Sequence, residues 1–356
     1  MVAFKLSCII AAGFMIGFWI YKYHKNDDIT LIEYKPMTEL DDFVLPELTI
    51  CLRNPVLNER MKKSGLKKSD YLKYLQGDNN SSKDFRNIEF HNVTLNIFDY
   101  FLNATMRLKS KKNQSDIRIC SSIQNCSYFE FKNNYNVIIN QAFLKCFGVE
   151  INKEYYKDMK YYLLRFDGKL KQVREEVSTS ILSFNLPNQL LRNFRGNKPF
   201  RWSTKDRNGT KILEVTSVEV LKRRNKRNEQ CMEDWMFYDN ILEQSHIDNI
   251  GCRAPYQTSQ NQLPVCSTEE KMKKVVFDSL NLAEKYPPPC QEMPDIAYNY
   301  GIDDADDFGD AIPLYVTYPD KWKIITLSKA LDVHALIGNI GGYIGLFLGR
   351  ITISKQ

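Results

Sequence analysis

The chain has 356 residues, of which 43% are hydrophobic, 26% are charged and 12% are aromatic. This much apolar material excludes global disorder, and a net charge of +6 is too mild for a dedicated nucleic-acid binder. A mean hydropathy of −0.41 excludes a polytopic membrane protein, but one or two spans fit that average because the whole chain dilutes them.

The two longest apolar stretches lie at the ends of the chain. Leu6–Tyr21 has 16 residues without a charge, and Leu336–Ile353 has 18 residues that include only one charge, Arg350. At about 1.5 Å per residue they reach roughly 24 and 27 Å, slightly short of a hydrocarbon core of about 30 Å. A signal peptide is the alternative for the first, although the run FWIYKYH offers no small-residue cleavage site. A buried core helix is the alternative for the second, although five glycines argue against it.

The cysteines indicate an oxidising compartment for the segment between these stretches. Cys8 lies inside the first stretch, and the other eight of the nine cysteines form an even set. An even set in a membrane-tethered chain favours four disulfides. Zinc is the alternative, but no Cys-x-x-Cys pair exists and the spacings are irregular.

Glycosylation sequons agree with that compartment, because all seven lie between the apolar ends: Asn79, Asn80, Asn92, Asn103, Asn113, Asn125 and Asn208. We expect Asn92, Asn103, Asn113 and Asn208 to be glycosylated. The few flanking charges do not decide the orientation. The simplest topology has a cytosolic segment at 1–5, a first span at 6–21, an extracellular domain at 22–335, the start of a second span at 336–353 and a C-terminal end at 354–356.

The extracellular segment predicts a mixed α+β domain. In chain order we expect a strand at Phe43–Leu52, partly helical structure at Leu57–Gln76, an amphipathic helix at Thr94–Leu108, strands at Val137–Phe147 and Lys211–Lys222, a helix at Ser267–Glu284, and two strands at Ile312–Leu327 around Pro319. Ser267 and Glu270 predict a capping box for the last helix.

Two charge clusters each allow two interpretations. The acidic run Asp303, Asp304, Asp306, Asp307 and Asp310 is a solvated loop or a divalent-cation or proton site. The basic run Lys222, Arg223, Arg224, Lys226 and Arg227 is a strand end leading to Cys231 or a basic processing site. In both cases the solvated or structural interpretation is favoured.

The C-terminal string LIGNIGGYIGLFLG resembles the start of the second transmembrane helix of the DEG/ENaC family, the amiloride-sensitive sodium channels, degenerins and acid-sensing channels. LPELTICLRNP, KCFGVEIN, and the cysteine-rich stretch from VEVLKRRNKRNEQC to PPPC are similar to further family segments in the same order. Gly341, Gly345 and Gly349 recur every four residues, and small residues at that spacing let helices approach closely in a bilayer.

This resemblance implies a trimeric sodium channel subunit in the plasma membrane, with identical or homologous partners and the second span lining the pore. It implies an α+β, disulfide-rich ectodomain of palm, finger, thumb and β-ball type, and no cofactor, metal, nucleic-acid partner or enzymatic activity. The implied disulfides are Cys51–Cys146, Cys120–Cys126, Cys231–Cys290 and Cys252–Cys266.

The resemblance also assigns pore and gate positions: Gly338, Asn339, Gly341, Gly342, Gly345, Gly349 and Arg350. Gly338 is similar to the small residue at which degenerin gates close. Arg350 and Ile351 stand where the family has a small residue and a serine in its filter, so Arg350 would repel sodium. Either the chain diverges there at an unrecognised exon boundary, being truncated at both ends, or the subunit does not conduct alone.

Two alternatives remain from other classes. One is a non-conducting or regulatory subunit of the same family. The other is a type II membrane-anchored lumenal enzyme, for which Asp304 and Asp306 offer a weak Asp-x-Asp metal pair.

Overall fold

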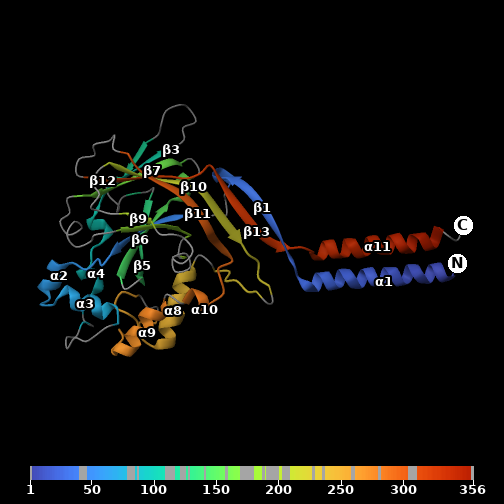
Figure 1. The fold of residues 1–356 in the computed structure, drawn as a ribbon, viewed down its shortest axis with the longest axis horizontal. Coiled ribbons are helices and arrows are strands. Elements are labelled where there is room, and N and C mark those ends of the chain that lie inside the picture. Colours follow the sequence, from blue (N-terminus) through green and yellow to red (C-terminus); the bar gives the residue numbers. More distant parts are fainter. Residues whose placement is uncertain are drawn as a thin grey trace.

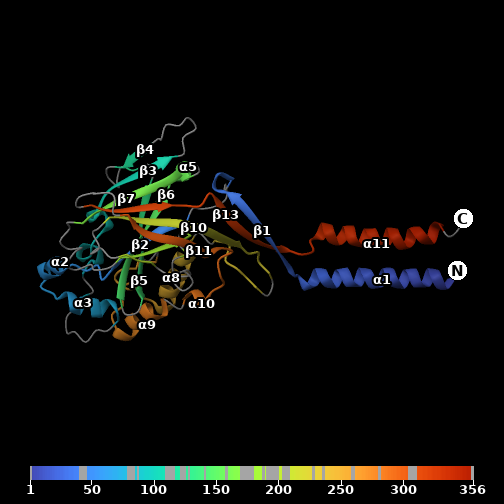
Figure 2. The same ribbon diagram turned by 45° about the horizontal axis from the view of Figure 1, so that its top comes forward.

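The computed structural model describes residues 2–39, 46–77, 85, 88–108, 117–120, 126, 129–139, 142–156, 159–168, 180–186, 189, 200–202, 209–226, 229–234, 237–257, 261–279, 282–303 and 311–353. They form a strand-rich domain from which two long helices project side by side (Figures 1 and 2). These helices are α1 (Val2–Lys25) and α11 (Val333–Ile353), at the two ends of the chain.

The strands form two sheets. The eight-stranded sheet has the order β1-β13-β10-β12-β7-β3-β4, with β11 paired to β10, and the five-stranded sheet has the order β5-β6-β2-β8-β9. The strands are β1 (Asp28–Pro36), β2 (Glu47–Arg53), β3 (Phe101–Leu108), β4 (Ile117–Cys120), β5 (Phe129–Ile139), β6 (Ala142–Ile151), β7 (Met159–Asp167), β8 (Ser180–Asn185), β9 (Phe200–Trp202), β10 (Thr210–Lys222), β11 (Gln291–Asp303), β12 (Ala311–Thr317) and β13 (Lys321–Lys329).

The main core lies between the two sheets. Tyr162, Leu164 and Phe166 are buried at every second position of β7, as a strand with one face on a core requires. They belong to the same buried cluster as Ile50 of β2 and Phe147 of β6, from the other sheet. The domain is therefore a sandwich whose two inner faces share one apolar layer.

Short helices form a second unit, which we call the helical lobe. Its buried cluster combines α2 (Asn58–Lys63), α3 (Lys68–Leu75) and α4 (Phe90–Val93) with α8 (Tyr238–Ile250) and α9 (Glu269–Ser279). The remaining helical segments are α5 (Lys153–Tyr156), α10 (Leu282–Lys285), and the 3₁₀ turns η1 (Met37–Glu39) and η2 (Ile97–Asp99). Phe143 of β6 is part of the lobe's cluster, so the lobe is seated directly on the five-stranded sheet.

β12 and β13 follow one another along the same side of β10. Lys211–Glu214 of β10 pair in parallel with Leu314–Thr317, and Glu219–Lys222 pair in parallel with Lys323–Thr326. β12 and β13 therefore cover consecutive parts of the same edge of β10, and the break around Pro319 separates them. The expected strands at Lys211–Lys222 and Ile312–Leu327 are confirmed.

Two expected elements are wrong. Thr94–Leu108 is not a helix: β3 occupies most of it and pairs with β7 and β4. Phe98 and Leu102, which the helical stripe would bury, are exposed. Val137–Phe147 is not one strand, because it spans the end of β5 and the start of β6, which pair as antiparallel neighbours.

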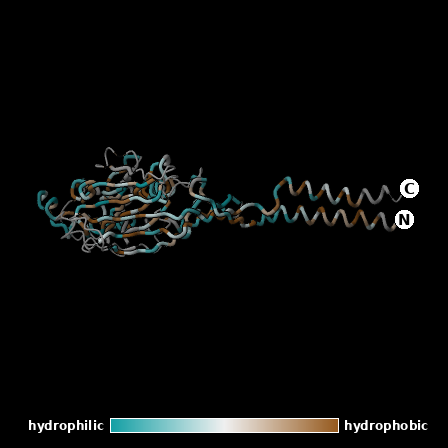
Figure 3. The backbone as a smooth tube through the Cα atoms, turned by 90° about the horizontal axis from the view of Figure 1, so that it is seen from above, coloured by the Kyte–Doolittle hydropathy of each residue, from teal (hydrophilic) through white to brown (hydrophobic). Residues whose placement is uncertain are grey.

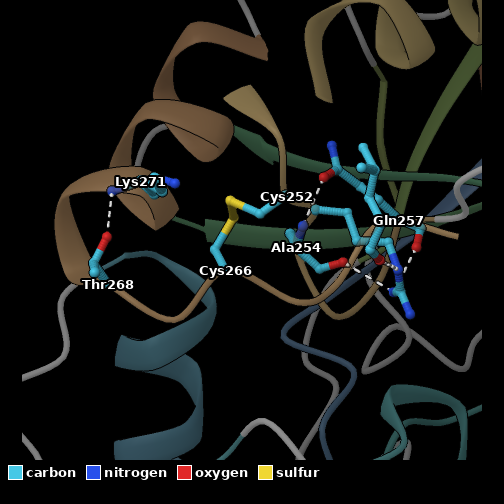
Figure 4. The surroundings of a disulfide bond; sticks show 8 residues. Cys252, Ala254, Gln257, Cys266, Thr268 and Lys271 are labelled. Carbon is cyan, nitrogen blue, oxygen red and sulfur yellow. Dashed lines mark hydrogen bonds between the residues drawn. A yellow bond between two sulfur atoms is a disulfide. The ribbon is translucent and has the colours of Figure 1, made fainter. Parts of the chain in front are cut away.

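Three other expected elements are confirmed in part. The strand at Phe43–Leu52 begins at Glu47, and its residues 43–45 lie outside the described ranges. The partly helical Leu57–Gln76 contains α2 and α3. Ser267–Glu284 contains α9 and α10, but the hydroxyl that caps α9 is that of Thr268, whose Oγ1 accepts from the Lys271 backbone N–H at 3.4 Å (Figure 4).

Four disulfides tie the domain together, and they join the pairs that the family resemblance implied. They are Cys51–Cys146 between β2 and β6, Cys120–Cys126, Cys231–Cys290, and Cys252–Cys266. Cys8 in α1 is free and buried. The chain is therefore a mixed α+β, disulfide-bonded protein with an apolar N-terminal helix.

Candidate functional site

α1 is long and apolar enough to cross a membrane. Leu6–Lys25 passes this test over 20 residues, and only 6% of its most apolar window is buried inside the structure. An apolar helix that the rest of the chain leaves uncovered is unlike the core helix of a soluble domain. Among the side chains that the structure describes, the apolar part of α11 is shorter, at Val333–Phe347, and a second span is not established.

Aromatic side chains hold α1 and α11 together. The ring of Trp19 in α1 stacks on that of Tyr343 in α11 at 6.5 Å between centroids, and Tyr343 in turn stacks on Phe347 at 6.4 Å. Brown apolar segments run along both helices where they lie side by side (Figure 3). The pair is therefore a laterally packed unit with a large exposed apolar surface.

Four of the glycines of α11 do not take part in this packing. A Cβ added at any of these four would meet nothing within 4 Å: Gly338, Gly341, Gly342 and Gly345. These small residues would allow another helix to approach closely, but in a single copy of the chain no helix that the structure describes does so. In particular, α1 does not pack against this face of α11. Asn339 is half-buried. Gly349 and Arg350 lie in the last turns of α11, beyond the last side chain that the structure describes.

Both long helices continue into one two-stranded ribbon (Figure 1). Two residues separate α1 from β1, which pairs antiparallel with β13 along its full length, from Asp28 opposite Lys329 to Pro36 opposite Lys321. β13 is followed after three residues by α11, whose first turn is capped by Asp332 through its Oδ1, which accepts from the Ala335 N–H at 2.6 Å.

An ion-pair cluster, which we call the Asp28 clamp, fixes this junction to the end of β10. The Asp28 carboxylate accepts from Arg224 Nε at 2.8 Å and lies 2.5 Å from Lys226 Nζ. Arg224 also donates to the backbone carbonyl of Asn26 at 2.9 Å, where the chain turns with a φ of 58° between α1 and β1. Burial alone would raise the pKa of Asp28, but the hydrogen bonds from Lys226 and Arg224 hold it below its usual value.

The basic run is therefore structural in most of its described members. Arg223 pairs with Glu292, and Arg224 and Lys226 pair with Asp28. A processing enzyme would have to break these pairs to reach the segment. Arg227 lies outside the described residues. Of the acidic run, only Asp303, at the end of β11, lies in a described range, and Asp304, Asp306, Asp307 and Asp310 do not.

The expected glycosylation sites differ in their surroundings. Asn92 is exposed at the end of α4, where its Nδ2 donates to Glu89. Asn103 lies within β3, and its Oδ1 accepts from Arg165 at 2.9 Å. Asn113 and Asn208 lie outside the described residues, as do Asn79, Asn80 and Asn125.

Sequence reasoning did not identify the residues that join the helices to the domain. Asp28 is separated from Arg224 by 196 positions, so no local pattern links them. Trp19 and Tyr343 come from opposite ends of the chain, and their stacking depends on the tertiary pairing of β1 with β13. Within the described ranges, no group of three or more His, Cys, Asp or Glu side chains is placed to hold a metal ion.

Comparison with known proteins does not assign the chain to a family. No protein-family model matches the chain, and no curated protein matches it. Among solved structures, the chain is similar to one described as the cryo-EM structure of a proton-activated chloride channel, with 8% sequence identity and a TM-score of 0.31 over 99% of this chain and 94% of that chain. A TM-score this low supports no conclusion about fold or ion.

Proposed function

We propose that this chain is a subunit of a trimeric sodium channel of the DEG/ENaC type, with α11 lining the pore. The observation that supports it best is the pair of apolar helices, α1 and α11, which continue into one β-ribbon of a disulfide-bonded domain. The LIGNIGGYIGLFLG string forms the second of these helices, as the resemblance implies. Catalysis is not part of the proposal.

The free glycine face of α11 supports assembly of several copies. Helices in a bilayer associate through packing of small residues, since lipid tails give no hydrophobic drive between them. α1 already packs on the aromatic side of α11. The uncovered side, with Gly341 and Gly345, is the side that would meet other copies around a central axis.

A cysteine cross-linking experiment tests this arrangement. In a chain with Cys8→Ser, we expect Gly345→Cys to form disulfide-linked species between copies after mild oxidation in membranes. The matched control is Ile10→Cys, which is exposed on α1. Native mass measurement in lipid nanodiscs should give three copies. A monomer, or cross-links from Ile10→Cys alone, would contradict the trimer with α11 at its centre.

Arg350 favours a second candidate, a subunit that does not conduct alone. We expect no sodium current from this chain expressed alone, and sequencing the transcript beyond codon 349 tests whether Arg350 belongs to the protein. In an assembly that does conduct, the reversal potential should follow external sodium. A reversal potential that follows chloride would contradict a sodium channel, and robust sodium current from this chain expressed alone would contradict the role given to Arg350.

A further inference from the structure

A buried cation lies where the helical lobe meets the five-stranded sheet. Lys145 of β6 is fully buried, and its Nζ donates to Thr94 Oγ1 at 2.9 Å. The same ammonium lies over the rings of Phe90 and Phe147, at 5.6 and 5.5 Å from their centroids. The cation is therefore held by one hydroxyl and two aromatic faces, which compensate only part of the cost of removing it from water.

The charged groups around Lys145 oppose one another. Asp99 attracts the ammonium at longer range, but Arg60 pairs with Asp99 at 2.9 Å and repels it. His91 of α4 interacts electrostatically with the ammonium: burial and then Lys145 lower the pKa of His91, whereas Glu89 raises it. Burial is the largest effect on Lys145 and lowers its pKa to about 8.

The aromatic rings that hold the ammonium also hold the lobe. The ring of Phe90 contacts those of Phe143 and Tyr256 at 5.3 and 5.9 Å, and Tyr256 lies 5.0 Å from Phe143. Tyr256 belongs to the loop that the Cys252–Cys266 disulfide closes (Figure 4). Burial raises the pKa of the Tyr256 hydroxyl, and the charge of Glu243 in α8 adds to that effect.

We propose that Lys145 is a pH-sensitive latch between the helical lobe and the five-stranded sheet: its ammonium form favours release of the lobe, and its neutral form favours docking. Thr94 already donates its hydroxyl proton to the Phe90 carbonyl at 3.0 Å, so it can accept from either form of the amine. The hydrogen bond survives titration, and what changes is the cost of a buried charge. This inference goes beyond channel function and does not depend on it.

The expected pH dependence has a definite shape. The docked amine titrates near pH 8, whereas a solvated lysine titrates near 10.5. Stability from this group is present above the solvated value and is lost as the pH falls through the docked value. By this linkage, opening of the junction should be nearly constant from pH 6 to 7 and should fall about tenfold from pH 7 to 9.

Hydrogen exchange on the full chain in nanodiscs measures this opening. The Leu95 amide donates to the Pro55 carbonyl at 2.8 Å, and the Leu57 amide donates to the Val93 carbonyl at 2.9 Å, so both report on this junction. After correction for intrinsic exchange, their protection should rise about tenfold from pH 7 to 9 in the wild type. Lys145→Met should abolish that rise, whereas Lys62→Met, which alters an exposed lysine of α2, should preserve it.

Two results would overturn the latch. One is protection of these two amides that does not change between pH 7 and 9 in the wild type, and the other is a rise in Lys145→Met as large as that in the wild type. If Lys145→Met does not fold, Thr94→Val keeps the proposal testable. It removes an acceptor whose hydrogen bond is stronger from the ammonium than from the neutral amine, so the pKa of the docked Lys145 should fall and the rise in protection should begin at a lower pH. An unchanged midpoint in Thr94→Val would then contradict the proposal.

Discussion

Asp28 has two cationic partners, and we expect its loss to weaken the junction below the helices. Asp28→Asn should lower the free energy of unfolding of the domain by about 2 kcal/mol, since it removes charge-assisted hydrogen bonds from Arg224 and Lys226 that are mostly shielded from water. Chemical denaturation followed by tryptophan fluorescence measures it. Asp27→Asn is the matched control, because Asp27 forms an exposed pair with Lys25.

The lowered pKa of Asp28 gives this prediction a pH signature. A carboxyl with a depressed pKa contributes stability above its unfolded value of 3.8 and loses that contribution as the pH falls through the folded value. The difference between wild type and Asp28→Asn should therefore shrink on acidification below pH 4. A difference that stays constant down to pH 2 would show that the ion pairs do not stabilise the fold.

Glycosylation should distinguish Asn92 from Asn103. An exposed asparagine at the end of a short helix is open to modification, whereas Asn103 lies within β3 and is engaged by Arg165. Asn92→Gln should reduce the apparent mass of the protein from cells, and Asn103→Gln should leave it unchanged. The reverse pattern, measured by glycosidase treatment and gel mobility, would contradict the placement of β3 inside the sheet.

Position 148 must be a glycine because the buried carboxylate of Glu47 occupies the space that a Cβ would need. An added Cβ at this position of β6 would come within 1.8 Å of Glu47 Oε1, and Glu47 is itself buried in β2. Gly148→Ala should therefore lower the free energy of unfolding by about 1–3 kcal/mol. Gly301→Ala in β11 is the control, because its Cβ would meet nothing within 4 Å. Equal effects of the two changes on the denaturation midpoint would refute this explanation.

At the scale of elements, α8 carries an acid with an unusual titration. Burial, the larger effect, raises the pKa of Glu243 to about 7, although a hydrogen bond from Gln257 lowers it. A raised pKa means that stability is fully present below the unfolded value of 4.5 and is lost as the pH rises through 7. Glu243→Gln should remove this loss, so the variant should gain stability relative to wild type from pH 5 to 8.

The denaturation midpoint of both proteins across this pH range checks the expectation. Glu270→Gln, at an exposed-face position in the first turn of the neighbouring α9, serves as the control and should follow the wild-type curve. Parallel curves for wild type and Glu243→Gln would mean that the Glu243 carboxyl does not titrate in this pH range.

Elements with a clear period were predictable from the sequence, and those decided by tertiary pairing were not. KILEVTSVEVLK is rich in β-branched residues and forms β10. FLNATMRL has apolar residues at spacings that also suit a helix, and only its place between β7 and β4 makes it β3. The cap of α9 was misplaced by one residue because Ser267 and Thr268 are both good capping residues.

At the scale of the molecule, the sequence located the two apolar helices but did not show how they pack together or attach to the domain. The two apolar ends were visible as uninterrupted stretches, and the disulfide pairs followed from a family resemblance. The Asp28 clamp and the stacking of Trp19 on Tyr343 were not visible, because each joins residues from distant parts of the chain. Long-range contacts of this kind are fixed by sheet topology, which no local pattern encodes.

The β-ribbon has a mechanical consequence. β13 is paired to β1 along the whole of Asp28–Pro36 but to β10 only at Glu219–Lys222. Sliding β1 past β13 would break a long ladder. Tilting the ribbon as a whole would strain the short ladder to β10, the Asp28 clamp, the Lys323–Glu219 ion pair, and the packing of Trp322 and Ile324 in the main core. The two strands of the ribbon are therefore joined to each other over more paired residues than join β13 to β10. A torque on the domain would swing α1 and α11 as one arm, and it would not pull them apart.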